Sequence, residues 1–171
     1  MKAQKNLMCR EDHSILLENS LITEIHLRYG KYPENHNESD IASDSIVERL
    51  TSYLKHDMVF IPVNIRDRHW YLVVINASKR QIQILDSLST LYDRTELELI
   101  VQGIMLQIGL AGEFLETDKM KWPDLKLDTW DVKEVFDRQL QKDGSSCGLF
   151  LLNFMEYWDG DGFSDMITQN I

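Results

Sequence analysis

Cys147 lies between a short Gly/Ser segment and an apolar run that is typical of a helix. Unpaired N–H groups and the positive end of the helix dipole favour the thiolate form of a cysteine at such a position. Gly144, Ser145 and Ser146 before it, and Gly148 after it, are small enough to leave room for an extended substrate backbone. They would also let the cysteine N–H face a developing oxyanion. Because a lone cysteine is more often a small core residue, a nucleophile here requires a base and further donors elsewhere.

His69 is the best candidate for that base among the five histidines. The other four lie in the polar N-terminal third, where a surface histidine without a catalytic role is the default expectation. His69 instead opens an apolar, strand-like run and is followed by Trp70, whose flat ring could cover a narrow substrate channel. A purely structural Trp70 in the core is the competing interpretation.

Asp86 and Gln141 could supply the two remaining groups that a thiol nucleophile needs. Asp86 ends an alternating strand 17 residues after His69, which is enough for one strand, a turn and a strand that returns to the same sheet edge. There it could accept the imidazole N–H and hold the tautomer that takes a thiol proton. Gln141 could add a side-chain donor to an oxyanion hole. Alone, each would be a capping aspartate or a surface glutamine, so the prediction of a cysteine protease depends on the whole set.

Composition limits the class of protein. A length of 171 residues suits one domain with a sizeable core. The net charge of −10 argues against a nucleic-acid-binding face. Two cysteines without a C-x-x-C motif, and no secretory signal, indicate a reducing compartment. We expect no membrane segment, since we find no apolar run that approaches the ~18 residues required, and no metal, since no cluster has ligand spacing.

The patterning changes along the chain from helical to strand-like. Residues 1–57 are polar and weakly patterned, with loop composition over residues 31–44. One helix face is indicated by Ile22, Ile25 and Tyr29. Ser45 is predicted to cap a helix that extends to residue 54, with Glu48 completing a capping box.

Three strand-like segments follow, at residues 58–65, 70–76 and 81–86. Their β-branched content, their period-two alternation and their short connections predict an antiparallel meander. Residues 96–110 have helical spacing, residues 130–140 favour a further strand, and residues 147–158 predict an apolar helix that is buried on all sides. The predicted class is α+β, with strands in the middle and helices on either side.

Three motifs carry a resemblance to a known family: His69-Trp70, Leu85-Asp86-Ser87-Leu88, and Gln141 followed by Ser146-Cys147-Gly148. As a set they resemble the Ulp/SENP cysteine proteases, which process and remove SUMO. The order His, Asp, Gln, Cys is similar to theirs and opposite to that of papain-type enzymes. The resemblance implies a circularly permuted papain-like fold: a mostly antiparallel central sheet flanked by helices, with the nucleophile at a helix N-terminus. It further implies one catalytic domain over residues 1–171, with its core at 58–160 and a divergent or shortened part at 1–57.

The resemblance also implies a role for each motif residue: Cys147 the nucleophile, His69 the base, Asp86 its partner and Gln141 the oxyanion donor. Trp70 would help to roof a tunnel for a flat Gly-Gly tail, because only glycine lacks the Cβ that would clash there. The reaction would be hydrolysis of a peptide or isopeptide bond after that Gly-Gly, through a thioester acyl-enzyme and without a cofactor.

Further expectations concern substrate and partners. Gly144, Ser145 and Ser146 would join Trp70 in contacting the substrate, and the partner would be SUMO or a related ubiquitin-like modifier with its conjugates. We expect a monomer in the nucleus or cytoplasm. Family members often carry Asp where Ser146 stands, and a Trp-Leu-x-Asp-like segment that grips the modifier is not found in residues 1–57. The alternatives are a modifier-binding module with weak or no catalysis, and a related enzyme with an unrelated substrate.

Overall fold

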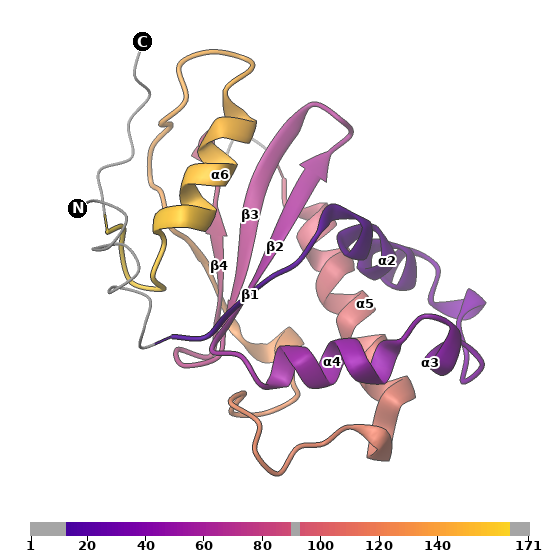
Figure 1. Cartoon of the computed structure of the whole chain (residues 1–171). Coiled ribbons are helices and arrows are strands. Elements are labelled where there is room, and N and C mark those ends of the chain that lie inside the picture. Colours follow the sequence, from indigo (N-terminus) through magenta and orange to yellow (C-terminus); the bar gives the residue numbers. More distant parts are fainter. Residues whose placement is uncertain (1–12, 90–92, 165–171) are drawn as a thin grey trace.

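A five-stranded sheet with helices on both faces forms the centre of the protein (Figure 1). The computed structural model of the chain describes residues 13–89 and 93–164. Within them the strands lie side by side in chain order: β1 Ile15–Leu17, β2 Met58–Ile65, β3 His69–Asn76, β4 Gln81–Leu85 and β5 Asp131–Glu134. The helices are α2 Ser20–Lys31, α3 Asp40–Ser43, α4 Ile46–Leu54, α5 Thr95–Ala111 and α6 Cys147–Tyr157, with 3-10 turns η1 Pro33–Asn35, η3 Gly112–Phe114 and η4 Leu127–Thr129. The α+β class is confirmed.

The central strands β2, β3 and β4 form the predicted antiparallel meander, and β1 and β5 add parallel neighbours at the two edges. In the β2–β3 turn, Arg66 and Asp67 have positive φ angles of 49° and 58°. Two successive left-handed residues are the geometry of a type I′ turn, whose twist matches that of the flanking strands. The turn makes Ile65 the register partner of His69, and His69 is therefore the first residue of β3.

Alternate strand residues divide between two hydrophobic cores. The larger core lies between the sheet and helices α2, α4 and α5, and includes Tyr71 and Ile84. The smaller core lies on the other face, under α6, and includes Leu72 (Figure 1). His69 lies two residues before Tyr71, and Asp86 lies two residues after Ile84, so strand alternation directs both side chains to the same face of the sheet.

Helices α2 and α5 cross at two glycines. A Cβ atom built on Gly103 would lie 1.9 Å from the carbonyl oxygen of His26, and one built on Gly30 would lie 1.9 Å from that of Leu99. Because the nearest atoms belong to the backbone, no side-chain rotation can relieve such a clash. The two helices therefore pack backbone to backbone, which sets how closely they cover the sheet.

Helix α5 is apolar along most of its length. By length and composition alone, Thr95–Phe114 could cross a membrane, with a mean hydropathy of 1.3. The expectation that the chain has no such segment is therefore wrong on this measure. In the folded chain Leu97, Ile100 and Ile104 lie in the larger core, so the apolar character of α5 serves packing against α2 and the sheet.

The N-terminal part contains more regular structure than expected. Short helical turns, η1 and α3, lie inside the segment whose composition predicts a loop. Ser45 directly precedes α4 as predicted, but its backbone is left-handed (φ 52°) and its side chain makes no capping hydrogen bond to this helix. The capping box with Glu48 is therefore wrong, because that box needs an extended residue at the cap position.

His26 on α2 is fully buried, although a surface position is the default for a histidine in such a polar region. The Gln107 amide donates to its Nδ1 (2.9 Å), and its Nε2 lies 2.7 Å from the Tyr53 hydroxyl, which donates to Glu18 (2.8 Å). Burial, with a smaller contribution from Arg49, lowers the pKa of His26 to about 3. The imidazole is therefore neutral near pH 7 and links α2 to α4 and α5.

Two C-terminal expectations are corrected by the structure. The strand predicted over residues 130–140 is confined to the four residues of β5. Helix α6 is not buried on all sides: Phe150 faces the smaller core, whereas Leu149 and Leu152 are each 62% exposed. Only one side of α6 meets the sheet, so its apolar composition does not imply burial all round.

Candidate active site

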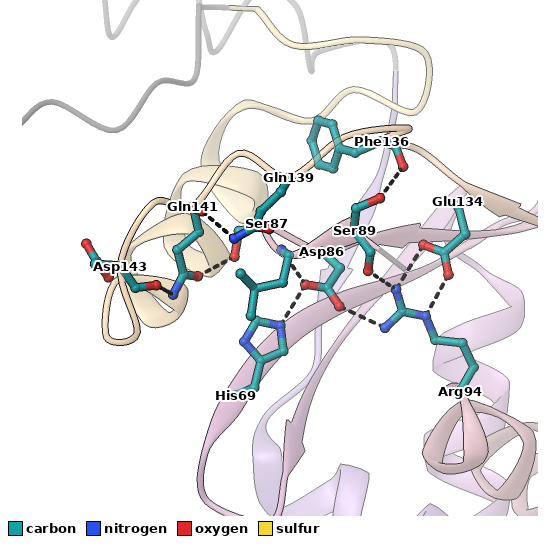
Figure 2. A network of polar contacts seen from close by, with 11 residues as sticks. His69, Asp86, Ser87, Ser89, Arg94, Glu134, Phe136, Gln139, Gln141 and Asp143 are labelled. Atoms are coloured by element: carbon teal, nitrogen blue, oxygen red, sulfur yellow. Dashed lines mark hydrogen bonds and ion pairs between the residues drawn. The ribbon is translucent and has the colours of Figure 1, made fainter. Parts of the chain in front are cut away.

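His69 and Asp86 meet at one end of the sheet (Figure 2). His69 Nε2 lies 2.6 Å from Asp86 Oδ1, and both side chains are almost completely buried. With the carboxylate ionised, Nε2 donates the hydrogen bond and Nδ1 is the imidazole nitrogen that can accept a proton. The pairing predicted from strand spacing is confirmed.

Asp86 is held as a carboxylate by several donors. Its Oδ1 also accepts the Leu88 N–H (2.9 Å), and its Oδ2 accepts Arg94 Nη1 (2.8 Å). Burial raises the pKa of Asp86, but the hydrogen bonds that it accepts outweigh burial and lower the pKa below its ordinary value. The carboxyl is therefore charged at neutral pH and can stabilise a positive imidazolium.

Cys147 is the first residue of α6, at the positive end of the helix dipole. It is buried, with 7% of its surface exposed, and it forms no disulfide. Helix α6 packs on one face of the sheet, and strand alternation assigns the His69 side chain to the other face. The sulfur and the imidazole can therefore meet only beyond the ends of the strands. The role of Cys147 as nucleophile stays a prediction.

Ser87 ties the segment that leads into α6 to the end of β4. Its carbonyl oxygen accepts the N–H groups of Leu140 (2.8 Å) and Gln141 (2.9 Å). Its hydroxyl donates to Gln141 Oε1 (2.7 Å), and Gln141 Nε2 donates to the Asp143 carbonyl oxygen (2.7 Å). These bonds orient the buried amide of Gln141 at the same end of the sheet as the histidine (Figure 2). A primary amide has a second N–H hydrogen, which could serve an oxyanion.

Asp143 organises the turn before α6. Its carboxylate accepts the N–H groups of Ser145 and Ser146 (2.8 Å each) and the Ser146 hydroxyl (2.6 Å). Gly144 is exposed, and a Cβ built on it would meet nothing within 4 Å. Space beside this turn is therefore open, as the small residues suggested, although their contacts with a substrate stay predictions.

Trp70 is half-buried against the smaller core, and its contact with a substrate stays a prediction.

The remaining polar residues of the site gave no clear signal in the sequence. Arg94 and Glu134 were missed, because nothing local indicates that residues 40 positions apart form an ion pair. Among the residues that the structure describes, no group of three or more His, Cys, Asp or Glu side chains could hold a metal ion.

A buried histidine–carboxylate pair at the end of a central sheet, with a cysteine opening the helix packed on that sheet, is the arrangement of a papain-like cysteine protease fold. The chain belongs to the Ulp1 protease family: the family's C-terminal catalytic domain matches residues 28–169. The resemblance seen in the sequence motifs is confirmed.

Two relatives illustrate how the chain compares with whole proteins of this kind. It is 29% identical over 114 residues to ubiquitin-like-specific protease 1A of Arabidopsis thaliana, and 30% identical over 109 residues to a sentrin-specific protease of Caenorhabditis elegans. These matches cover 66% and 64% of this chain. The chain spans only 20% and 14% of the length of the two relatives.

Solved structures confirm the fold. The SUMO protease Ulp1 with its catalytic cysteine oxidised to a sulfonic acid has a TM-score of 0.57 and 18% identity. The C-terminal Ulp1 protease domain in complex with Smt3, the yeast ortholog of SUMO, has a TM-score of 0.54 and 16% identity. The two matches cover 97% and 96% of this chain but 66% and 65% of those chains.

Proposed function

We propose that this chain is a cysteine protease domain that cleaves after the C-terminal Gly-Gly of SUMO or another ubiquitin-like modifier. The observation that carries the proposal is the buried 2.6 Å contact between His69 and Asp86 in a chain of the Ulp1 family whose cysteine opens α6. Such a set provides a base, its orienting carboxylate and a nucleophile.

The first half of the reaction forms an acyl-enzyme. The Cys147 sulfur attacks the carbonyl carbon of the second glycine, and the thiol proton passes to His69 Nδ1. The carbonyl oxygen becomes an oxyanion, for which the Cys147 N–H and the Gln141 amide are the candidate donors. As the C–N bond breaks, His69 returns the proton to the leaving amine, and the modifier remains as a thioester.

The second half regenerates the enzyme. His69 takes a proton from a water molecule, whose oxygen attacks the thioester carbon, and the C–S bond breaks with return of the proton to sulfur. The modifier leaves with a free C-terminal carboxylate. Throughout, Asp86 accepts the Nε2–H bond and stabilises each imidazolium form.

The partner and the setting belong to the same proposal. The Smt3 complex of a solved relative supports a ubiquitin-like modifier as the partner. The net charge of −10 favours a partner with a basic patch over a nucleic acid. We propose a monomer that acts in the nucleus or cytoplasm, where a reduced thiol persists.

The test is a panel of SUMO, ubiquitin and related modifiers that each carry a C-terminal electrophile. We expect covalent labelling of the folded wild-type chain by at least one of them, seen as a mass increase of one modifier. The matched control is the same probe with valine in place of the penultimate glycine, which should not label because its side chain would block a narrow slot.

Two outcomes would count against the proposal. Absence of labelling by every probe, with circular dichroism showing a folded chain, would reject the protease assignment. If calorimetry then detected modifier binding, the alternative of an inactive binding module would replace it.

Gln141→Ala is expected to lower kcat by about 10²- to 10³-fold with little change in KM, the usual cost of one oxyanion donor. Steady-state hydrolysis of a fluorogenic Gly-Gly conjugate measures both constants. Gln102→Ala, an exposed glutamine on α5, is the control and should leave both unchanged. A Gln141→Ala variant with wild-type kcat would remove this residue from the oxyanion hole.

A further inference from the structure

Arg94 joins the carboxylate of Asp86 to β5 (Figure 2). Its Nη1 donates to Asp86 Oδ2 (2.8 Å), while Nε and Nη2 donate to the two carboxylate oxygens of Glu134 (2.6 and 3.0 Å). Nη2 also donates to the Ser89 carbonyl oxygen (2.8 Å). The guanidinium lies over the Tyr71 ring, 4.7 Å from its centroid. Contacts from β3, from β5 and from the turn after β4 therefore hold one side chain in place.

The charges in this cluster explain why an arginine is suited to the position. The Asp86 side chain is fully buried, and a buried carboxylate needs a compensating positive charge. A neutral imidazole cannot supply that charge, whereas a guanidinium is permanently protonated. Burial alone would lower the pKa of Arg94, but its hydrogen bonds to Glu134 and Asp86 raise it.

We propose that Arg94 is a positioning residue that fixes the rotation of the Asp86 carboxylate, with Glu134 as its counter-ion, so that Oδ1 always faces His69 Nε2. The expected effect of Arg94 on catalysis rests on the proposed protease function. The expected effect of Arg94 on the Asp86 carboxylate does not. Arg94 does not need to touch the substrate in this role.

The consequence of losing Arg94 follows from the tautomers of histidine. Oδ2 would lose the charged donor Nη1, the carboxylate could rotate, and burial would favour its neutral form. A protonated Asp86 could donate to His69 Nε2 and thereby favour the tautomer with hydrogen on Nδ1. That tautomer cannot take a proton from a thiol, so catalysis would fail although every catalytic residue was still present.

The groups that surround the cluster set the expected pH dependence. Besides His69 and Arg94, the charged or titratable side chains around the cluster in the described part of the chain include Tyr71 on β3, Glu96 in the first turn of α5 and Glu134 on β5. The acidic side chains of Glu96 and Glu134 would disfavour the ionised form of Asp86 if Arg94 were absent. Plotted against pH, kcat is expected to fall on the acid side, and this fall is called the acid limb. Removal of Arg94 should therefore move the acid limb to higher pH.

Arg94→Met is the test variant, and Arg94→Lys separates charge from geometry. For Arg94→Met we expect kcat to fall about 10- to 100-fold, the usual range for a partner in the outer shell of a site, with KM unchanged and the acid limb moved upward. Arg94→Lys should return the acid limb to its wild-type position but recover kcat only in part, because lysine lacks the planar fork that reaches both carboxylates. Activity is normalised to the folded fraction at each pH.

The second measurement is independent of any modifier. In the chain labelled with ¹³C at the aspartate carboxyl carbons, the Asp86 signal of the wild type should titrate below the ordinary range of an aspartate, because of the hydrogen bonds that the carboxylate accepts. In Arg94→Met the same signal should titrate at a higher pH than in the wild type. Arg80→Gln is the matched control, since Arg80 pairs with Asp124 (2.7 Å) at the opposite end of the β3–β4 hairpin, and it should change neither readout.

The outcomes separate this inference from the proposed function. Unchanged kcat, acid limb and Asp86 titration in a folded Arg94→Met variant would overturn the inference. So would a loss of activity that disappears after normalisation to folded protein. If no modifier were ever hydrolysed by the wild type, the proposed function would fail, and the carboxyl titration would still decide whether Arg94 holds Asp86.

Discussion

Cys147→Ala should abolish both covalent labelling and turnover, with kcat reduced by about 10⁴-fold or more. Without the sulfur no atom of the site can form the thioester, so the remaining oxyanion donors have no tetrahedral intermediate to stabilise. Non-covalent affinity for the modifier should stay within about twofold, because Cys147 as a whole is only 7% exposed and its thiol contributes little contact area. Intact-mass labelling, steady-state kinetics and calorimetry measure these three effects.

Two further cysteine variants make this test specific. Cys147→Ser keeps the size of the side chain but replaces a readily ionised thiol with a hydroxyl, and it should be as inactive as the alanine variant. Cys9→Ala removes the other cysteine of the chain, at a position outside the described residues, and should leave labelling unchanged. Labelling that persisted in Cys147→Ala and was lost in Cys9→Ala would move the nucleophile and refute the proposed site.

Gly103→Ala is expected to lower the free energy of unfolding by about 3 kcal/mol, at the upper end of the range for overpacked sites. The added Cβ would lie 1.9 Å from a backbone oxygen of α2, so the whole helix has to move away from α5. Alanine is a better helix former than glycine by about 1 kcal/mol, but a clash with the backbone outweighs that gain. For a domain of this size the melting temperature should fall by roughly 6–12 °C.

Gly109→Ala on the same helix is the control. A Cβ at Gly109 would meet nothing within 4 Å, so only helix propensity acts there, and stability should rise by about 0.5–1 kcal/mol. If Gly103→Ala lowers the free energy of unfolding and Gly109→Ala raises it, the close contact between α2 and α5 is established. A Gly103→Ala variant as stable as the wild type would show that the helices can separate at no cost.

Much of the framework could be predicted from local patterns. β-branched runs with short connections indicated the meander, and a continuous apolar run indicated α6. Helical spacing indicated α5, because burial of one side of an element leaves a periodic trace in its own sequence. The pairing of His69 with Asp86 could also be predicted, because 17 residues allow one strand, a turn and a strand that returns to the same sheet edge. His69 and Asp86 begin and follow strands whose alternation directs both side chains to one face of the sheet.

The tertiary structure alone decided which distant polar groups meet. Arg94 and Glu134 carry no local sign of their partner, and the parallel pairing of β5 with β4 brings them together beside Asp86. His26 looked like a surface histidine, yet it is buried where α2, α4 and α5 meet. The sequence around a polar residue is the same whether water or a distant side chain makes its hydrogen bonds. The partner therefore depends on how the elements pack.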